Sequence, residues 1–462
     1  WDGPGAFGGA SGPVIHNLAT GLIEARSDAP LTEWNAFATL NNEGVFRKTS
    51  SGDKTMRLNV NNRGRFEALA GSLLIQATRF NNHGEVKLNG GVTLTLAGGG
   101  TNSGAFTLQD TARLVFAAGG LHHLRQGATF SGPGMVELGG PSTEARLVVD
   151  GEVSMLRLTV ALGKLSGAGT LTVTETMHWT GGSVEMLGGT LVIAPGAVLA
   201  MDGAGQKTLA GTLQNGGTII WEGTGAFQGA SGPVIHNLAT GLIEARSDAP
   251  LTQWSGPATL NNEGVFRKVH GLGTKALEAQ FVNSGRLELL AGTLQVRGNF
   301  TNSTDGTVHF ALGGPAGGSD YGVLAVTGRA QLDGAIEVAL TNGFRPALSN
   351  LFQVITANPR IGTFSTERGL LLGEGLKLTP LYAASSVSLL VTNAPAETPL
   401  VLTLERAGEG LRLSWQPALT NVTVLSTEDL AAGTWSEFVR SATNWLLIAP
   451  TNELRFFRVR QP

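Results

Sequence analysis

The sequence predicts an all-β chain in which a right-handed parallel β-helix, or β-solenoid, with turns of about 20 residues precedes a small C-terminal β-sandwich. Three observations support this prediction. Asn-x-Gly tripeptides recur at regular intervals, apolar residues alternate with polar ones after each tripeptide, and a long block of sequence occurs twice. Because one short turn cannot bury its own apolar face, the turns are expected to stack into a rod.

The Asn-x-Gly tripeptides recur every 20 residues and are predicted to form the structural corners of successive turns. Glycine accepts a positive φ without steric cost, and asparagine tolerates it better than most residues. Stacked asparagines are also expected to hydrogen-bond to one another, because successive turns lie roughly 4.8 Å apart. The corner residues are Asn42, Gly44, Asn62, Gly64, Asn82, Gly84, Asn102 and Gly104.

The residues after each glycine have the alternation of a strand with one buried face. Gly64 is followed by Phe66 and Ala68, and the corresponding positions one and two turns later include Val86 and Phe106. Apolar residues at every second position place their side chains on one face of a strand. We therefore predict that Phe66, Val86 and Phe106 lie in one inner column of the solenoid.

A duplication of 220 residues defines the larger organisation. Gly9–Thr32 and Gly229–Thr252 are identical, and the same offset aligns Trp1 with Trp221. We expect the solenoid to cover 1–310, with the block from 1 partly repeated from 221. The final turns and a cap are then expected over 311–395, and a β-sandwich module over 396–462.

The repeat style of 1–310 resembles the β-solenoid passenger domains of bacterial autotransporter-type adhesins. The segments DYGVLAVTG from Asp320, LDGAIEV from Leu332 and FQVI from Phe352 are similar to the closing segment of such solenoids. This resemblance implies an extracellular or cell-surface location, and any targeting segment is expected to lie before Trp1.

The C-terminal region follows a Pro- and Thr-rich linker at Thr392–Leu402. Its short alternating segments, LRLSW from Leu411 and TWSEFV from Thr434 among them, resemble the small β-sandwich modules of exported proteins from Verrucomicrobia-like and Planctomycetes-like bacteria. The closing arginines are interpreted as the outward face of an edge strand rather than as an acid-binding patch. They are Arg455, Arg458 and Arg460.

Composition argues against several classes of partner and cofactor. The net charge is −3, charged residues make up 15%, and aromatic residues make up 6%, so no basic stripe or stacking platform for nucleic acid is expected. Cysteine is absent, which removes thiol chemistry and cysteine-based metal sites. No apolar run approaches the 18 or more residues of a membrane span. No cofactor is predicted, and the expected partners are surface glycans or further copies of this chain.

The strongest candidate for a site is a pair of duplicated loops that carry Trp34 and Trp254. Glu33 precedes the first tryptophan, whereas Gln253 precedes the second, and glutamine cannot act as a general acid. We therefore predict no catalytic residues. The tryptophans are interpreted as packed loop residues, with stacking on a sugar ring as the alternative. The eight histidines, among them the adjacent His122 and His123, are interpreted as corner or surface residues rather than metal ligands.

These expectations lead to a structural or adhesive surface rod, able to assemble with itself into fibres, that has no catalytic activity. The alternatives are a carbohydrate-binding protein and a carbohydrate-active β-helix of the lyase or hydrolase kind. An enzyme of that kind needs paired carboxylates, or a carboxylate and a cation, on adjacent turns.

Overall fold

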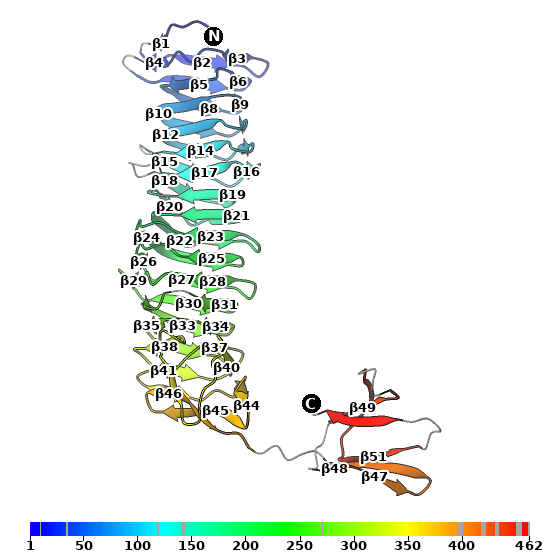
Figure 1. Cartoon of the computed structure of the whole chain (residues 1–462). Helices are drawn as coiled ribbons and strands as arrows, with labels where there is room; N and C mark the ends of the chain where they lie inside the picture. The colour runs from blue at the N-terminus through cyan, green and yellow to red at the C-terminus, as the bar shows by residue number, and fades with distance from the viewer. Residues whose placement is uncertain are drawn as a thin grey trace. The chain divides into compact units, whose positions relative to one another are not determined.

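The computed structural model describes residues 1–9, 11–33, 36–117, 120–139, 145–269, 271–395, 401–416, 422–429, 434–449 and 455–460. The chain divides into two compact units, Trp1–Thr392 and Asn393–Pro462. The described residues contain strands and no helix. The first unit is a parallel β-solenoid of about 14 turns of ~21 residues, which confirms the predicted fold class (Figure 1).

Each turn contributes one strand to each of three parallel stacks, which we call faces A, B and C. Six long strands, β10, β12, β19, β21, β22 and β24, run through a corner, so that each contributes to two faces. Face A contains β1 (Phe7–Gly9), β4 (Leu31–Glu33), β7 (Asp53–Met56), β10 (Ser72–Asn82), β12 (Thr93–Asn102), β14 (Arg113–Phe116), β17 (Met135–Leu138), β19 (Glu152–Val160), β21 (Thr170–Trp179), β23 (Val198–Met201), β25 (Thr218–Trp221), β28 (Leu242–Ala245), β31 (Val265–Lys268), β34 (Arg286–Leu289), β37 (Thr307–Leu312), β40 (Ala335–Leu340) and β43 (Thr366–Arg368).

The other two faces complete the turns. Face B contains β2 (Val14–Asn17), β5 (Ala38–Asn42), β8 (Leu58–Asn62), β10, β12, β15 (Leu121–Leu124), β18 (Arg146–Val149), β20 (Lys164–Ser166), β22 (Gly182–Ile193), β24 (Lys207–Asn215), β26 (Phe227–Gly229), β29 (Leu251–Gln253), β32 (Thr274–Leu277), β35 (Thr293–Val296), β38 (Val323–Val326) and β41 (Leu351–Thr356). Face C contains β3 (Leu22–Ala25), β6 (Val45–Lys48), β9 (Arg65–Ala68), β11 (Glu85–Leu88), β13 (Ala105–Leu108), β16 (Thr129–Ser131), β19, β21, β22, β24, β27 (Val234–Asn237), β30 (Ala258–Asn262), β33 (Ala279–Asn283), β36 (Phe300–Asn302), β39 (Ala330–Leu332) and β42 (Arg360–Gly362).

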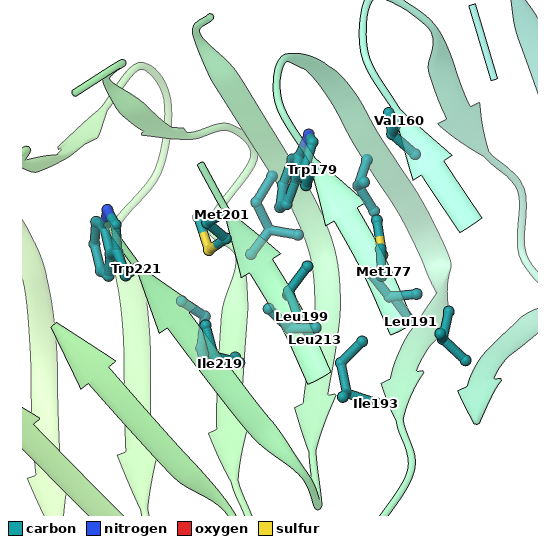
Figure 2. Close-up of a cluster of buried hydrophobic side chains, with 14 of the residues drawn as sticks. Val160, Met177, Trp179, Leu191, Ile193, Leu199, Met201, Leu213, Ile219 and Trp221 are labelled. Atoms are coloured by element: carbon teal, nitrogen blue, oxygen red, sulfur yellow. The ribbon is translucent and has the colours of Figure 1, made fainter. Parts of the chain in front are cut away.

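One continuous hydrophobic core fills the interior of the stack. Val86 pairs in register with Phe66 in one neighbouring turn and Phe106 in the other, and all three side chains are fully buried. The prediction of a common inner column is therefore confirmed. In the middle of the rod, Trp179 and Trp221 project inward from β21 and β25 and join the same core (Figure 2).

The predicted asparagine corners form a buried ladder. The side-chain amide of Asn42 donates to the carbonyl oxygen of Asn62 at 2.7 Å, and Asn62 donates in turn to Asn82 at 2.8 Å. Asn17 extends the ladder upward by donating to Asn42 at 2.7 Å. The hydrogen-bonding groups of these buried amides are thus satisfied by one another rather than by water.

The glycines of these corners serve a different purpose from the one predicted. The expected positive φ is absent from Gly44, Gly64, Gly84 and Gly104. Instead, a Cβ atom at Gly64 would overlap the backbone oxygen of Gly44, and one at Gly84 would overlap that of Gly64. Glycine is required here because stacked corners approach one another too closely for any side chain.

The duplicated block does not return to the same face. β2 lies on face B, whereas its identical counterpart β27 lies on face C. Likewise β3 lies on face C, and its counterpart β28 lies on face A. The repeat therefore covers ten complete turns and one further face, and equivalent surfaces of the two copies point in directions about a third of a turn apart.

The parallel stack ends in an antiparallel cap. β46 (Ser386–Asn393) pairs antiparallel with β41, and β44 (Leu371–Gly373) forms a hairpin with β45 (Leu376–Ala383). The last parallel strands, β38 to β43, continue the three faces without a break near residue 310.

The second unit consists of two small antiparallel sheets. One contains β47 (Val401–Ala407), β48 (Gly410–Gln416) and β51 (Trp445–Ile448), and the other contains β50 (Ser436–Ser441), β49 (Val422–Thr427) and β52 (Phe456–Arg460). β52 lies at the edge of its sheet, as expected for the arginine-rich ending. One of these arginines, Arg458, stacks on Trp435 at 4.5 Å from the ring centre.

Candidate functional site

The two predicted loop tryptophans are placed differently by the structure. Trp34 lies outside the described residues, as does the side chain of Glu33. Trp254 lies at the corner between β29 and β30, where 73% of its surface is exposed. The interpretation of a packed loop residue is therefore wrong for Trp254, because this corner turns the ring away from the core. Stacking on a sugar ring stays a prediction.

An outer row of asparagines on face B is the clearest polar surface of the first copy. We call Asn41, Asn61 and Asn81 the amide stripe. Each precedes a buried corner asparagine, so its side chain points outward because neighbouring residues of a strand face opposite sides. Asn61 donates to the carbonyl oxygen of Asn41 at 2.8 Å, and Asn81 donates to that of Asn61 at 2.9 Å.

The amide stripe lies in a shallow hollow of about 490 Å³. His16, Glu43, Arg63 and His83 complete its lining, together with the corner asparagine Asn42. His83 is tied to Ser103 through a contact of 2.8 Å between its Nδ1 and the hydroxyl oxygen. The hollow thus presents amide donors and acceptors, two imidazoles, one guanidinium and one carboxylate. Such a surface matches ligands that carry many hydroxyl groups.

Sequence reasoning missed the amide stripe, although its signal is in plain view. The dipeptide Asn-Asn occurs at 41–42, 61–62 and 81–82, with one asparagine on each side of the strand. The Asn-x-Gly spacing marks only the second, inward asparagine of each pair, because that residue begins the corner. A second periodic polar residue on the outer side indicates an ordered exposed row.

The second copy does not reproduce the amide stripe. Its corresponding row begins with His236 and Asn261, whose side-chain nitrogens lie 3.3 Å apart, and continues with Val282 and Thr301. Valine at the position of Asn61 removes the amide while keeping the strand. The row of three stacked asparagines therefore occurs in the first copy and not at the corresponding positions of the second.

Rows of alternating positive and negative side chains also lie on the outer surface of the solenoid, on face C in the first copy and on face A in the second. In the first copy, Glu24, Arg47 and Glu67 follow one another on face C, and Nε of Arg47 lies 2.7 Å from a carboxylate oxygen of Glu67. In the second copy the equivalent row lies on face A, where it includes Glu288 and His309. These rows link successive turns through paired charges.

The charged cluster at the lower end of the second copy is the best candidate for acid–base chemistry, yet its geometry opposes that role. Arg286 forms a two-pronged ion pair with Glu337, with N–O distances of 2.9 and 2.8 Å. The hydrogen bonds from Arg286 lower the pKa of Glu337 to about 2. Burial lowers the pKa of the neighbouring His309. A carboxylate held ionised in this way cannot donate a proton near neutral pH.

Buried lysines seal the corners of both copies. Lys54 donates to the backbone oxygen of Ser27 at 2.8 Å, and its ammonium group lies 3.4 Å from the ring centre of Trp1. The second copy repeats this contact between Lys275 and Trp221 at 3.3 Å. Burial lowers the pKa of Lys54 to about 8. Both lysines are inaccessible to solvent, so their role is structural.

The two adjacent histidines diverge as expected for an extended segment. His123 points outward, with Nδ1 2.7 Å from a carboxylate oxygen of Asp150. His122 points inward and is fully buried against Phe116, at 4.9 Å between ring centres. The interpretation as a corner or surface residue is wrong for His122, because it occupies an inward position of β15. Burial lowers its pKa to about 4.

Within the described ranges, no group of three or more histidine, aspartate or glutamate residues is arranged to hold a metal ion. In that same part of the chain, no helix is long and apolar enough to cross a membrane. In comparisons with known proteins, no protein-family model matches the chain, and no curated protein matches it in sequence.

Proposed function

We propose that this protein is a structural and adhesive β-solenoid of the extracellular space or cell surface, and that it has no catalytic activity. The observation that carries this proposal is the single hydrophobic core, together with the parallel strand pairing that joins successive turns from β1 to β43. Such an array places its two ends far apart with little sequence complexity, which suits a spacer.

The arrangement of charged groups supports a non-catalytic role. The carboxylates of Glu288 and Glu337 in this cluster are paired with the guanidinium groups of Arg267 and Arg286. Glycoside hydrolysis needs two carboxyl groups with different pKa values on either side of the substrate. The carboxylate of Glu337, which lies 3.2 Å from His309, is held ionised by Arg286.

A second candidate function, glycan binding, is favoured by the amide stripe and by exposed Trp254. Stacked amides offer hydrogen bonds at each successive turn, and an exposed indole offers an apolar face to a sugar ring. These two features lie in different copies. We therefore propose the amide stripe as the main binding surface for an extended glycan, and Trp254 as a separate one.

The adhesive proposal is tested on a glycan array with variants that the chain itself tolerates. Asn61→Val and Asn81→Thr introduce the residues of the second copy at the equivalent positions, so folding is expected to be retained. We expect the double variant to lose at least about tenfold in glycan affinity, since each lost hydrogen bond contributes about 1 kcal/mol. The matched control is Val282→Asn. Unchanged binding by the double variant would exclude the stripe.

Catalysis is tested separately, on a panel of acidic and neutral polysaccharides. We expect no increase in reducing ends or unsaturated uronates over buffer. Turnover that disappears in a Glu33→Gln variant would contradict the non-catalytic proposal and favour a carbohydrate-active enzyme.

A further inference from the structure

Positive side chains border the amide stripe on two sides. Alternate residues along β8 and its flanks point outward, and they are Arg57, Asn59, Asn61 and Arg63, of which both arginines are exposed. One turn later Arg79 continues this outer side, since its backbone nitrogen donates to the side-chain oxygen of Asn59 at 3.1 Å. Two guanidinium groups therefore lie where the strands begin, and the third lies at the corner where they end.

These three arginines differ from their neighbours in having no carboxylate partner. On the adjacent face C, Arg47 lies 2.7 Å from Glu67, and Arg65 lies 2.8 Å from Glu85. Within the part of the chain that the structure describes, no ion pair involves any of the three arginines that border the stripe. Arginine stays charged at all physiological pH values, and its planar fork matches the paired oxygens of a carboxylate or sulfate group. Their charge is therefore free to meet an acidic ligand.

The second copy lacks these guanidinium groups as well as the amide stripe. Equivalent positions are identified by the register of β8 on β5 and of β33 on β30, which is the same in both copies. Joint absence is expected when the amides and the guanidinium groups contact one ligand. The replacements are Glu278 for Arg57, Ser284 for Arg63 and Asn299 for Arg79.

The remaining groups of the hollow favour a glycan over a nucleic acid. The carboxylate of Glu43 lies in the lining beside Arg63 and the amides, so the hollow is not uniformly positive. A chain of phosphates would be repelled by this carboxylate, whereas a sugar hydroxyl can donate to it. Among the described residues, no phenylalanine, tyrosine or tryptophan lines the hollow, so it offers no platform on which bases could stack.

We propose that the ligand of the amide stripe is an acidic glycan, whose carboxylate or sulfate groups pair with Arg63 and Arg79 while its hydroxyl groups bond to the stripe. This inference rests on the proposed glycan-binding function and names the class of glycan. Successive turns lie roughly 4.8 Å apart, so neighbouring sugars of an extended chain meet amides and guanidinium groups on adjacent turns. Arg57 adds positive potential at the start of β8.

Isothermal titration calorimetry on the full chain tests the proposal with an alginate oligosaccharide, which carries one carboxylate on each sugar. The neutral comparison is the same oligosaccharide after its carboxylates have been reduced to alcohols. We expect the acidic form to bind at least about tenfold more tightly at low salt, because hydrogen bonds to charged groups are the stronger ones. Added salt should reduce this difference. Dextran sulfate compared with dextran provides the same test for sulfate groups.

The double variant Arg63→Ser, Arg79→Asn introduces the residues of the second copy, so folding is expected to be retained. We expect its affinity for the acidic probe to fall at least about tenfold, to that of the neutral probe, and its affinity for the neutral probe to stay unchanged. The matched control, Arg368→Ser with Arg406→Asn, removes two exposed arginines elsewhere and should bind like the natural chain.

Each contrary result has a distinct meaning. Equal affinity for the acidic and neutral forms of both probes would overturn the acidic preference and leave glycan binding in place. Binding of none of the four glycans would remove the glycan-binding function itself, and the inference with it. Single-stranded DNA that binds as tightly as the acidic glycans would also overturn the proposal, because the arginines would then recognise negative charge without regard to sugar.

Discussion

At the scale of single residues, the Asn-x-Gly corner combines two separate requirements. The asparagine satisfies buried backbone groups and its own neighbours, whereas the glycine allows one corner to lie directly on the next. The period in the sequence was sufficient to predict the position of both residues. It was not sufficient to predict why glycine is needed, because close approach between turns depends on three-dimensional stacking rather than on local φ preference.

The ladder makes a prediction about two asparagines that look alike in sequence. Asn62 both accepts and donates within the ladder, whereas the carbonyl oxygen of Asn102 has no hydrogen-bond partner, and the next residue in its column is Leu124. We expect Asn62→Leu to destabilise the solenoid by about 2–4 kcal/mol, because it leaves buried amides unpaired. Asn102→Leu is expected to change stability by less than about 1 kcal/mol.

The midpoint of urea unfolding, followed by circular dichroism, measures both variants against the natural chain. Equal losses of stability in the two variants would show that Asn62, inside the ladder, contributes no more to stability than Asn102 at its end.

A second residue-scale prediction concerns the buried His122. Its pKa of about 4 lies below its usual value of 6.5, so the unfolded chain binds more protons than the folded chain between these values. Stability is therefore complete above pH 6.5 and is lost as the pH falls toward 4, by up to roughly 3 kcal/mol.

His122→Leu is expected to flatten this part of the stability curve, because Leu147 already occupies the equivalent position one turn later. Urea unfolding between pH 4 and 7 provides the measurement. Leu147→Met changes the same inward column without removing a titratable group, so it serves as the control and should leave the slope unchanged. A slope that survives His122→Leu would mean that another group titrates in this range.

At the scale of the element, alternation predicts strands well and corners less well. The inward positions of β9, β11 and β13 follow directly from residues two apart in the sequence. The uninterrupted passage of β19 and β21 through a corner was not predicted, because neither Leu156 nor Thr174 marks a break that differs from the strand around it. The sequence also could not indicate that the duplicate lies on another face, since this depends on the summed length of ten unequal turns.

The exact repeat provides an internal control for the stability of single elements. Gly9–Thr32 and Gly229–Thr252 have identical intrinsic exchange rates, but within residues 1–462 only the second is paired with a turn on each side. We expect amides of β2 and β3 to exchange at least about a hundredfold faster than those of β27 and β28, because terminal elements open locally at low free energy.

Hydrogen exchange read by mass spectrometry resolves the two copies when the peptides extend to Glu33 or Gln253, where the sequences diverge. Equal protection of both copies would show that the first strands are as stable as internal ones, and that their exposed edge has no energetic consequence.

At the scale of the whole solenoid, contacts link each turn chiefly to its immediate neighbours along the stack. Stability in such arrays is approximately a sum over turns and the interfaces between them. A solenoid pulled from its two ends is therefore expected to open turn by turn rather than all at once.

Single-molecule force spectroscopy on Trp1–Thr392 tests this expectation. A turn of ~21 residues should add about 70 Å of contour length when it opens, given roughly 3.3–3.6 Å for each extended residue. Lengthening in steps of one or a few turns is the expected trace. A single rupture that releases the entire solenoid would contradict additive stability.

The change of face between the two copies has a consequence for anything attached to this rod. Two partners that recognise the shared sequence Val14–Asn17 and Val234–Asn237 would leave the shaft in different directions. A flat sheet of ligand can therefore meet one copy but not both. The solenoid therefore presents its two copies to binding partners in different directions, which suits it to bridging objects that do not lie in one plane.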